Sequence, residues 1–91
     1  MAVNVEIPHL LRELTAGKDK VSIEAETVGR ALEELEKVFP GIRARICRGD
    51  GSLHPFVNLY VSEEDVRFLD GLDTQLKDAD VITILPMIAG G

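Results

Sequence analysis

The apolar run Val81-Ile82-Thr83-Ile84-Leu85 limits the fold of this chain more than any other stretch. It is short and β-branched, and turn residues bound it, which predicts a buried strand. Because the run is apolar at nearly every position, we expect a central strand that is covered on both faces. Paired parallel to the first strand of the chain, it would direct the residues that follow it away from the domain.

The first half of the chain predicts a hairpin followed by one main helix. Ala2 to Ile7 and Val21 to Ala25 alternate apolar and polar residues, as half-buried strands do, and the connection between them is long enough for a helical turn. Pro40-Gly41 predicts the end of the helix, and Gly29 predicts a close contact between helix and sheet. Thr27 is the predicted N-cap, and the apolar residues after it follow the helical period of one buried stripe: Val28, Ala31, Leu32, Leu35, Val38 and Phe39.

The second half predicts two or three further strands. Ile42 to Cys47 alternates, with Ile42, Ala44 and Ile46 on one face, and Phe56 to Val61 predicts the next strand, with Val57, Leu59 and Val61 inward. Ser62 to Asp65 is typical of a charged turn, and one helical turn is expected within Gly71 to Leu76. This order predicts an α+β domain over residues 1–86, a mixed sheet of four or five strands with one main helix packed across it.

Composition and charge exclude several classes of partner. The chain has 91 residues, enough for one domain, and a formal net charge of −6. Nucleic acid and anionic membrane surfaces need clustered lysine and arginine, so we expect neither as a partner, whereas a basic protein surface fits. No apolar run approaches the ~20 residues that span a bilayer, and no signal-peptide pattern is present. One cysteine excludes an internal disulfide framework, so the expected location is the cytoplasm.

The stretch after the last strand, residues 87–91, predicts a flexible tail that ends in Gly90-Gly91. Glycine lets the backbone approach another surface closely and adopt φ/ψ values that are closed to other residues. Such a tail can thread a narrow channel and present its terminal carboxylate to an enzyme. The alternative is a frayed terminus, since chain ends are commonly disordered.

Cysteine and histidine are the other candidates for chemistry. Cys47 has Arg45 and Arg48 nearby in sequence, which would activate its thiol, but a lone cysteine in an apolar stretch is also typical of a packed small residue. His9 and His54 stand far apart, with no second ligand at a spacing that suits zinc. We therefore expect no metal site.

An aromatic patch is the candidate surface for binding a protein partner. Phe56 and Tyr60 alternate away from the predicted core, so their face of the sheet is expected to be partly open. Next to Met87 and Ile88, these rings would suit a protein interface. The alternative is that a helix or a loop covers them.

Three stretches carry a resemblance to a known family: Phe56 to Val61, Glu64-Asp65-Val66-Arg67, and Val81 to Pro86 followed by Ala89-Gly90-Gly91. With the element order of nearly the whole chain, they make the sequence similar to the β-grasp sulfur carriers of the molybdopterin-synthase small-subunit and thiamin sulfur-carrier family, prokaryotic relatives of ubiquitin. The first two stretches resemble the branch that serves cysteine biosynthesis. One departure is Ala79, where the family often has glycine in the turn before the last strand.

The resemblance implies a β-grasp, ubiquitin-like fold and a function for the tail. An E1-like enzyme that uses ATP and Mg²⁺ would adenylate the carboxylate of Gly91, and sulfide or persulfide sulfur would then replace AMP to give a thiocarboxylate. Gly90 would be the threading residue, and Ala89, Ile88 and Met87 would contact the partner. The sequence has no glycine-rich phosphate loop, so the chain would be a protein substrate and not an enzyme, with no cofactor of its own.

Three functions fit the tail at this stage. As a sulfur carrier, the chain would pass its sulfur to a cysteine synthase-like enzyme or, alternatively, to the large subunit of molybdopterin synthase. As a ubiquitin-like modifier, it would use the same activated tail to conjugate to lysine amines. As a plain interaction domain, it would carry an incidental Gly-Gly end.

Overall fold

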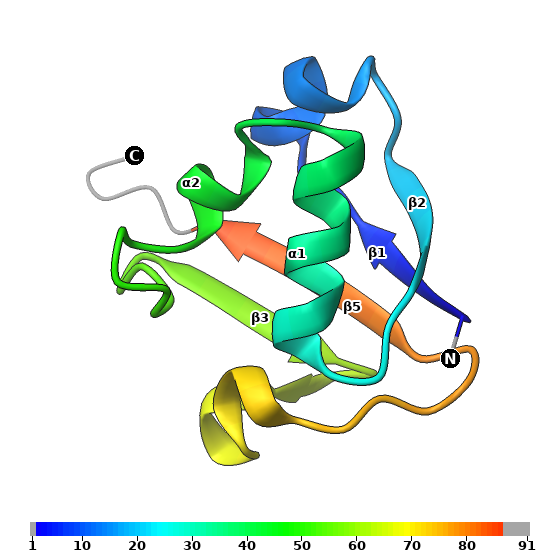
Figure 1. Cartoon of the computed structure of the whole chain (residues 1–91), viewed down its shortest axis with the longest axis vertical. Coiled ribbons are helices and arrows are strands. Elements are labelled where there is room, and N and C mark those ends of the chain that lie inside the picture. Colours follow the sequence, from blue (N-terminus) through cyan, green and yellow to red (C-terminus); the bar gives the residue numbers. More distant parts are fainter. Residues whose placement is uncertain (1, 87–91) are drawn as a thin grey trace.

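The last strand of the chain lies at the centre of a mixed sheet (Figure 1). The structure, a computed structural model, describes residues 2–86. The strands are β1 Ala2–Glu6, β2 Lys20–Glu24, β3 Val57–Val61, β4 Glu64–Asp65 and β5 Val81–Pro86. In this part of the chain they form one five-stranded sheet in the order β2-β1-β5-β3-β4. β5 pairs parallel to β1 and antiparallel to β3, so the predicted parallel pairing of the first and last strands is confirmed.

One long helix, α1 Val28–Val38, lies across one face of this sheet (Figure 1). It begins where predicted, because the Thr27 side chain accepts a hydrogen bond of 3.2 Å from the backbone N–H of Arg30. The remaining elements are the short helix α2 Ile42–Ile46 and three 3₁₀ turns, η1 His9–Thr15, η2 Val66–Phe68 and η3 Gly71–Asp73. The helical turns that were expected in the two long connections are therefore present. No helix within residues 2–86 has the length and apolar character needed to cross a membrane.

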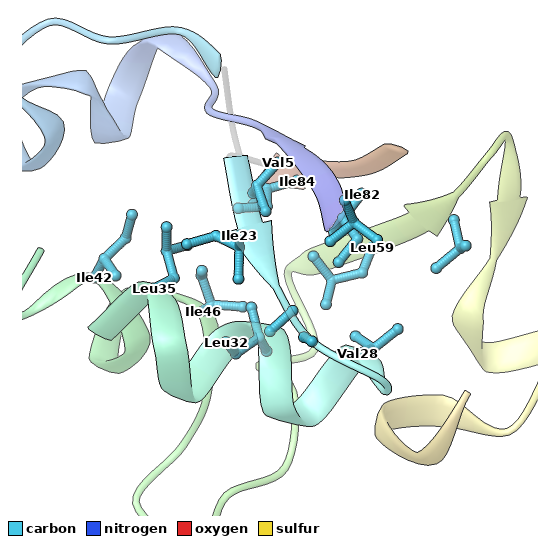
Figure 2. Packing of buried hydrophobic residues seen from close by; sticks show 14 of the residues in the cluster. Val5, Ile23, Val28, Leu32, Leu35, Ile42, Ile46, Leu59, Ile82 and Ile84 are labelled. Atoms are coloured by element: carbon cyan, nitrogen blue, oxygen red, sulfur yellow. The ribbon is translucent and has the colours of Figure 1, made fainter. Parts of the chain in front are cut away.

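The hydrophobic core fills the space between α1 and the sheet. Figure 2 shows Val28, Leu32 and Leu35 of α1 facing the strand residues, with Ile42 of α2 beyond Leu35. Ile46 of α2 is buried in the same core. Alternate residues of the strands supply the other half of the core: Val3, Val5, Ile23, Val57, Leu59, Val61, Ile82 and Ile84. Removing these apolar side chains from water is the main favourable term in folding, so one helix and one sheet face suffice for a domain of this size.

Val38 does not belong to the buried stripe in which the sequence placed it. Its side chain is 56% exposed, whereas Val28 and Leu35 are fully buried. At 3.6 residues per turn, Val38 lies roughly 80° around the helix from Val28, beyond the edge of the inward face. The prediction for Val38 was therefore wrong.

The predicted strand Ile42 to Cys47 is wrong, because the structure has the helix α2 there. Ile42 and Ile46 are both buried, but Ala44, which a strand would bury with them, is exposed. Gly41 enters the helix with a left-handed φ of 99°. The Glu36 carboxylate then accepts hydrogen bonds of 2.9 Å from the backbone N–H groups of Gly41 and Arg43. These contacts satisfy donors that a short helix leaves free at its start.

The predicted charged turn Ser62 to Asp65 contains the edge strand β4. Glu64 and Asp65 pair with Val61 and Tyr60 of β3 across a two-residue turn. Both turn residues, Ser62 and Glu63, have positive φ, which is the geometry of the tight turn that joins antiparallel strands. That turn is usually recognised by Asn-Gly or Asp-Gly, so Ser-Glu gave no signal for it.

β5 is central as predicted, but only one of its faces is covered. Ile82 and Ile84 point into the core, while Leu85 is 46% exposed on the opposite face. Helices lie on one side of this sheet, so its other side remains open, as is common in sheets with antiparallel strands. Gly29 likewise makes a close contact, but to a different element than expected. A Cβ atom at Gly29 would lie 3.2 Å from the Leu72 carbonyl oxygen in η3 and not against the sheet.

Candidate functional site

The candidate site is the C-terminal end of β5, where the predicted tail begins. β5 is paired on both sides up to Thr83 and remains paired with β3 up to Pro86, whose partner is Val57. Because the strand is paired to this point, the sheet itself fixes the position of Pro86. Residues 87–91, to which the sequence assigned adenylation at Gly91 and partner contacts before it, lie outside the described residues. Their roles remain predictions.

The face of the sheet opposite α1, which we call the open face, carries Tyr60, one of the predicted partner-binding residues. Tyr60 is paired directly with Thr83 and is partly exposed, so the expectation that this face is partly open is confirmed for Tyr60. Phe56 is 57% exposed, but it lies in the turn before β3 and stacks on His54. Leu85 is also exposed on this face, which the sequence did not predict, because a fully apolar run does not show which of its residues point to solvent.

Two exposed apolar sites near the end of β5 have different neighbours. Tyr60, Thr83 and Leu85 line a shallow depression on the open face together with Glu63. Phe56 lies in the turn before β3, next to Val57, which pairs with Pro86, and Tyr60 lies about 10 Å further along the strand from Val57. The structure therefore places Phe56 at the end of β5 and Tyr60 towards its middle. They do not form one continuous aromatic patch.

Side-chain hydrogen bonds hold the strands near both of these exposed sites in place. Thr83 Oγ1 donates a hydrogen bond of 3.0 Å to Glu6 Oε1, which links β5 to β1. The Arg67 guanidinium donates to the Asn58 side-chain oxygen and, at 2.7 Å, to the carbonyl oxygen of Val57. Val57 is the partner of Pro86, so Arg67 supports the strand that holds the end of β5. The sequence singled out Arg67 only as a member of a stretch that resembles a known family, and not as a residue that supports β3.

Cys47 is a packed residue in this structure. Its side chain is 3% exposed, and burial raises the pKa of the Cys47 thiol, with the Arg43 charge opposing the change. A thiol that stays protonated is a poor nucleophile. The structure therefore favours the packed alternative over an activated thiol.

The histidines do not form part of a metal site within the described residues. Residues 2–86 contain no group of three histidine, cysteine, aspartate or glutamate side chains that could hold a metal ion. His54 instead stacks on Phe56, with ring centroids 6.2 Å apart, and its Nε2 lies 3.3 Å from the Ala44 carbonyl oxygen. It is a structural residue between α2 and β3.

The sheet order, the single crossing helix and the central C-terminal strand define a β-grasp, ubiquitin-like domain. Residues 5–91 match the ThiS family, and the chain belongs to that family. It is 46% identical over 93 residues to the sulfur carrier protein CysO of Mycobacterium tuberculosis, and the match covers 100% of each protein. A chain in the crystal structure of the Amycolatopsis orientalis BexX/CysO complex is 44% identical, with a TM-score of 0.92, over 98% of this chain and 99% of that one.

A further similarity bears on the alternative functions. Small archaeal modifier protein 3 of Haloferax volcanii is 38% identical over 65 residues, which are 71% of this chain and 70% of that protein. The similarity to CysO is higher and extends over the full length. The predicted fold and the predicted sulfur carrier, closest to the branch that serves cysteine biosynthesis, are confirmed by these matches.

Proposed function

We propose that this chain carries sulfur as a thiocarboxylate on Gly91 and delivers it to a cysteine synthase-like enzyme. The observation that carries the proposal is the position of β5. The strand is locked between β1 and β3 and holds Pro86 at the end of the sheet, five residues before Gly91. In this proposal the enzyme binds the folded domain, and the narrow segment that ends in glycine reaches the enzyme's active site.

The proposed chemistry needs a partner because a carboxylate is a poor electrophile at neutral pH. Its oxygen would attack the α-phosphate of ATP and release pyrophosphate, which gives an acyl adenylate. Sulfide would then form a C–S bond to the Gly91 carbonyl carbon while the C–O bond to AMP breaks, which gives the thiocarboxylate. A persulfide donor would first give an acyl disulfide, and a thiol would then release the thiocarboxylate by forming a disulfide with the donor's own sulfur. We assign ATP and Mg²⁺ to an E1-like activating enzyme, so this chain would be a protein substrate with no cofactor of its own.

The open face is the proposed contact with partner enzymes. Leu85 and Tyr60 expose apolar surface on this face, and Phe56 is exposed separately, next to the residue that pairs with Pro86. An apolar centre with polar residues around it is typical of transient protein interfaces. We place the exchange in the cytoplasm, with neither nucleic acid nor membrane as partner.

Two alternatives use the same activated tail. The family resemblance leaves the large subunit of molybdopterin synthase as a second possible acceptor. The similarity to small archaeal modifier protein 3 favours, as a second candidate function, conjugation of Gly91 to lysine amines. Mass spectrometry of protein purified from its native host separates the carrier from the modifier, since a thiocarboxylate exchanges one oxygen for sulfur and a conjugate gains a whole protein. A pull-down of the acceptor enzyme separates the two possible acceptors.

ATP–pyrophosphate exchange with the cognate activating enzyme tests the proposal. Deleting Gly90 and Gly91 moves the carboxylate about 7 Å back along an extended chain, and reactions lose heavily from displacements of about 1 Å. Exchange should therefore fall to background, while the melting curve stays unchanged because no core residue is touched. One residue added after Gly91 should have the same effect, and Gly90→Val should be intermediate.

The outcome that contradicts the proposal is normal exchange with the two-glycine deletion. That result would remove the carrier and the modifier together and leave a plain interaction domain. Binding of the deleted chain to the activating enzyme serves as the control for a surface that still docks.

A further inference from the structure

The outer edge of β2 is a part of the sheet that the proposed function does not use. β2 ends the sheet on one side, at the margin of the molecule in Figure 1, and no further strand within residues 2–86 pairs with its outer side. It has five residues, whereas β4 at the opposite edge has two. An edge strand of this length presents a row of backbone N–H and C=O groups with which another chain can pair.

Alternate residues of β2 direct their backbone groups either to β1 or outward from the sheet. Just before β2, the Ile7 N–H donates to the Asp19 carbonyl oxygen at 2.8 Å, and the two strands then pair residue by residue. Counted in steps of two from Asp19, the residues that bond to β1 are Val21 and Ile23. The residues that direct their backbone groups outward are therefore Lys20, Ser22 and Glu24.

β2 lacks several features that usually prevent an edge strand from pairing. It contains no proline, and its described register with β1 has no bulge. On the helix side, a depression lined by Thr27, Arg30 and Glu34 lies beside Glu24, so α1 leaves space there. Val21 packs against the core from this edge but is only half-buried. A neighbouring strand would cover its remaining apolar surface.

The charges of this edge complement those of a second copy of the chain. Lys20 stands two residues before Ser22, and Glu24 stands two residues after it. In an antiparallel pair centred on Ser22, Lys20 of each copy faces Glu24 of the other, and the two serines face each other. Every outward N–H and C=O group then has a partner, and Val21 meets Ile23 on the helix side. Opposite charges directly across antiparallel strands stabilise such a pair.

Other ways of pairing the two edges lose these contacts. A shift by two residues places Lys20 or Glu24 opposite Ser22, and a pair centred on either charged residue places like charges opposite each other. A parallel pair in register also sets like charges side by side, which is destabilising. Only the pair centred on Ser22 matches both the backbone groups and the charges, so the edge selects one register.

We propose that β2 is the contact through which two copies of this chain form a symmetric dimer. The contact joins the five strands of each copy into one ten-stranded sheet, with the two-fold axis at the Ser22 pair. Five strand spacings, about 24 Å, separate the two β5 strands, and their Pro86 ends point in opposite directions. Both open faces therefore remain accessible, and the dimer does not depend on the proposed function.

The test follows mass and backbone hydrogen exchange over a range of protein concentrations. A ladder of five residues is about 17 Å long, so the interface is small and the dimer is of the weak class. In sedimentation velocity, the mass should rise from 10.0 kDa towards twice that value as the concentration is raised to about 1 mM. The Ser22 N–H should exchange more slowly at high concentration, whereas exchange of the Val21 N–H, which bonds to β1, should change much less.

Reversing the charges at the two ends of the ladder makes the test specific. Lys20→Glu and Glu24→Lys each place like charges across both ends, so each should weaken self-association about tenfold or more. An equimolar mixture of the two variants restores opposite charges at both ends and should associate at least as well as the parent chain. Lys77→Glu, at an exposed lysine before β5, changes the net charge as Lys20→Glu does and should have no effect.

Several outcomes would overturn the proposal. A mass that stays at 10.0 kDa, a dimer in which Ser22 exchange does not change, or single variants that associate as the parent does would each exclude this contact. Slower Ser22 exchange only after the activating enzyme is added would assign the edge to a strand of that enzyme and not to a second copy. Melting curves show that both variants are folded. Sulfur transfer is not measured, so failure here is distinct from failure of adenylation.

Discussion

Replacing Ala79 by glycine should stabilise this domain, which is the opposite of the usual effect of glycine. Ala79 lies in the turn before β5 with a φ of 70°, in the left-handed region, and its methyl group is exposed. Its N–H donates to the Ala2 carbonyl oxygen at 2.8 Å, a bond that glycine keeps. The methyl group therefore adds strain without burying apolar surface.

The size of the effect follows from two opposing terms. A side chain in the left-handed region costs about 1–2 kcal/mol, because its Cβ lies too close to the following carbonyl oxygen. Glycine costs about 0.4–1 kcal/mol more in chain entropy on folding. The free energy of unfolding should thus rise by about 0.5–1 kcal/mol, and Tm by about 2–8 °C for a domain of this size.

Two matched alanines make the test sharp. Ala16 is also exposed, with a φ of 55°, so Ala16→Gly should shift stability in the same direction. Ala44 is exposed in α2, so Ala44→Gly should lower stability by about 0.5–1 kcal/mol. Urea unfolding followed by circular dichroism measures all three variants against the parent chain. If Ala79→Gly and Ala16→Gly lose stability as Ala44→Gly does, neither alanine is strained and the reasoning fails.

Three further changes probe the core, a capping carboxylate and the buried thiol. Leu32→Ala should lower the free energy of unfolding by about 2–5 kcal/mol, since Leu32 is 1% exposed, and a urea melt that shows under about 0.5 kcal/mol would contradict the assigned buried face. Backbone hydrogen bonds from Gly41 and Arg43 lower the pKa of Glu36, so its contribution is present above its unfolded pKa and is lost as pH falls through the folded pKa. Glu36→Gln should therefore destabilise at neutral pH and much less near about pH 3 in paired urea melts, and an equal effect at both would count against the cap. Cys47→Ser should keep sulfur transfer, and complete loss of transfer by a folded variant would make the thiol a participant.

The sequence predicted correctly those elements in which apolar residues recur at a regular spacing or in which a capping residue marks the start. Thr27 and the helical spacing of Val28 to Leu35 predicted α1, and the alternation of Val3, Val5 and Ile7 predicted β1 and its buried face. These patterns succeed because each apolar residue in them packs into the same core, so the period of the sequence matches the period of the backbone.

Short segments failed because their sequences fit more than one backbone. In Ile42 to Ile46, the two isoleucines are four residues apart and share a face in a strand as well as in a helix. The structure has a helix there, and the Glu36 carboxylate of α1 stabilises its start by accepting hydrogen bonds from the backbone N–H groups of Gly41 and Arg43. The turn at Ser62-Glu63 was not predicted for a similar reason. The pairing of β4 with β3 holds both turn residues at positive φ, and neither of them is a glycine that would mark the turn in the sequence.

The sequence by itself determined the strands β1 and β5, the helix α1, the family and the Gly-Gly end, because each is written in contiguous residues. Only the tertiary structure decided that β5 has one open face, and that Phe56 lies next to the residue that pairs with Pro86 while Tyr60 lies towards the middle of β5. These features depend on which side of each strand the helices cover and on contacts between residues far apart in the chain, and no local period encodes either.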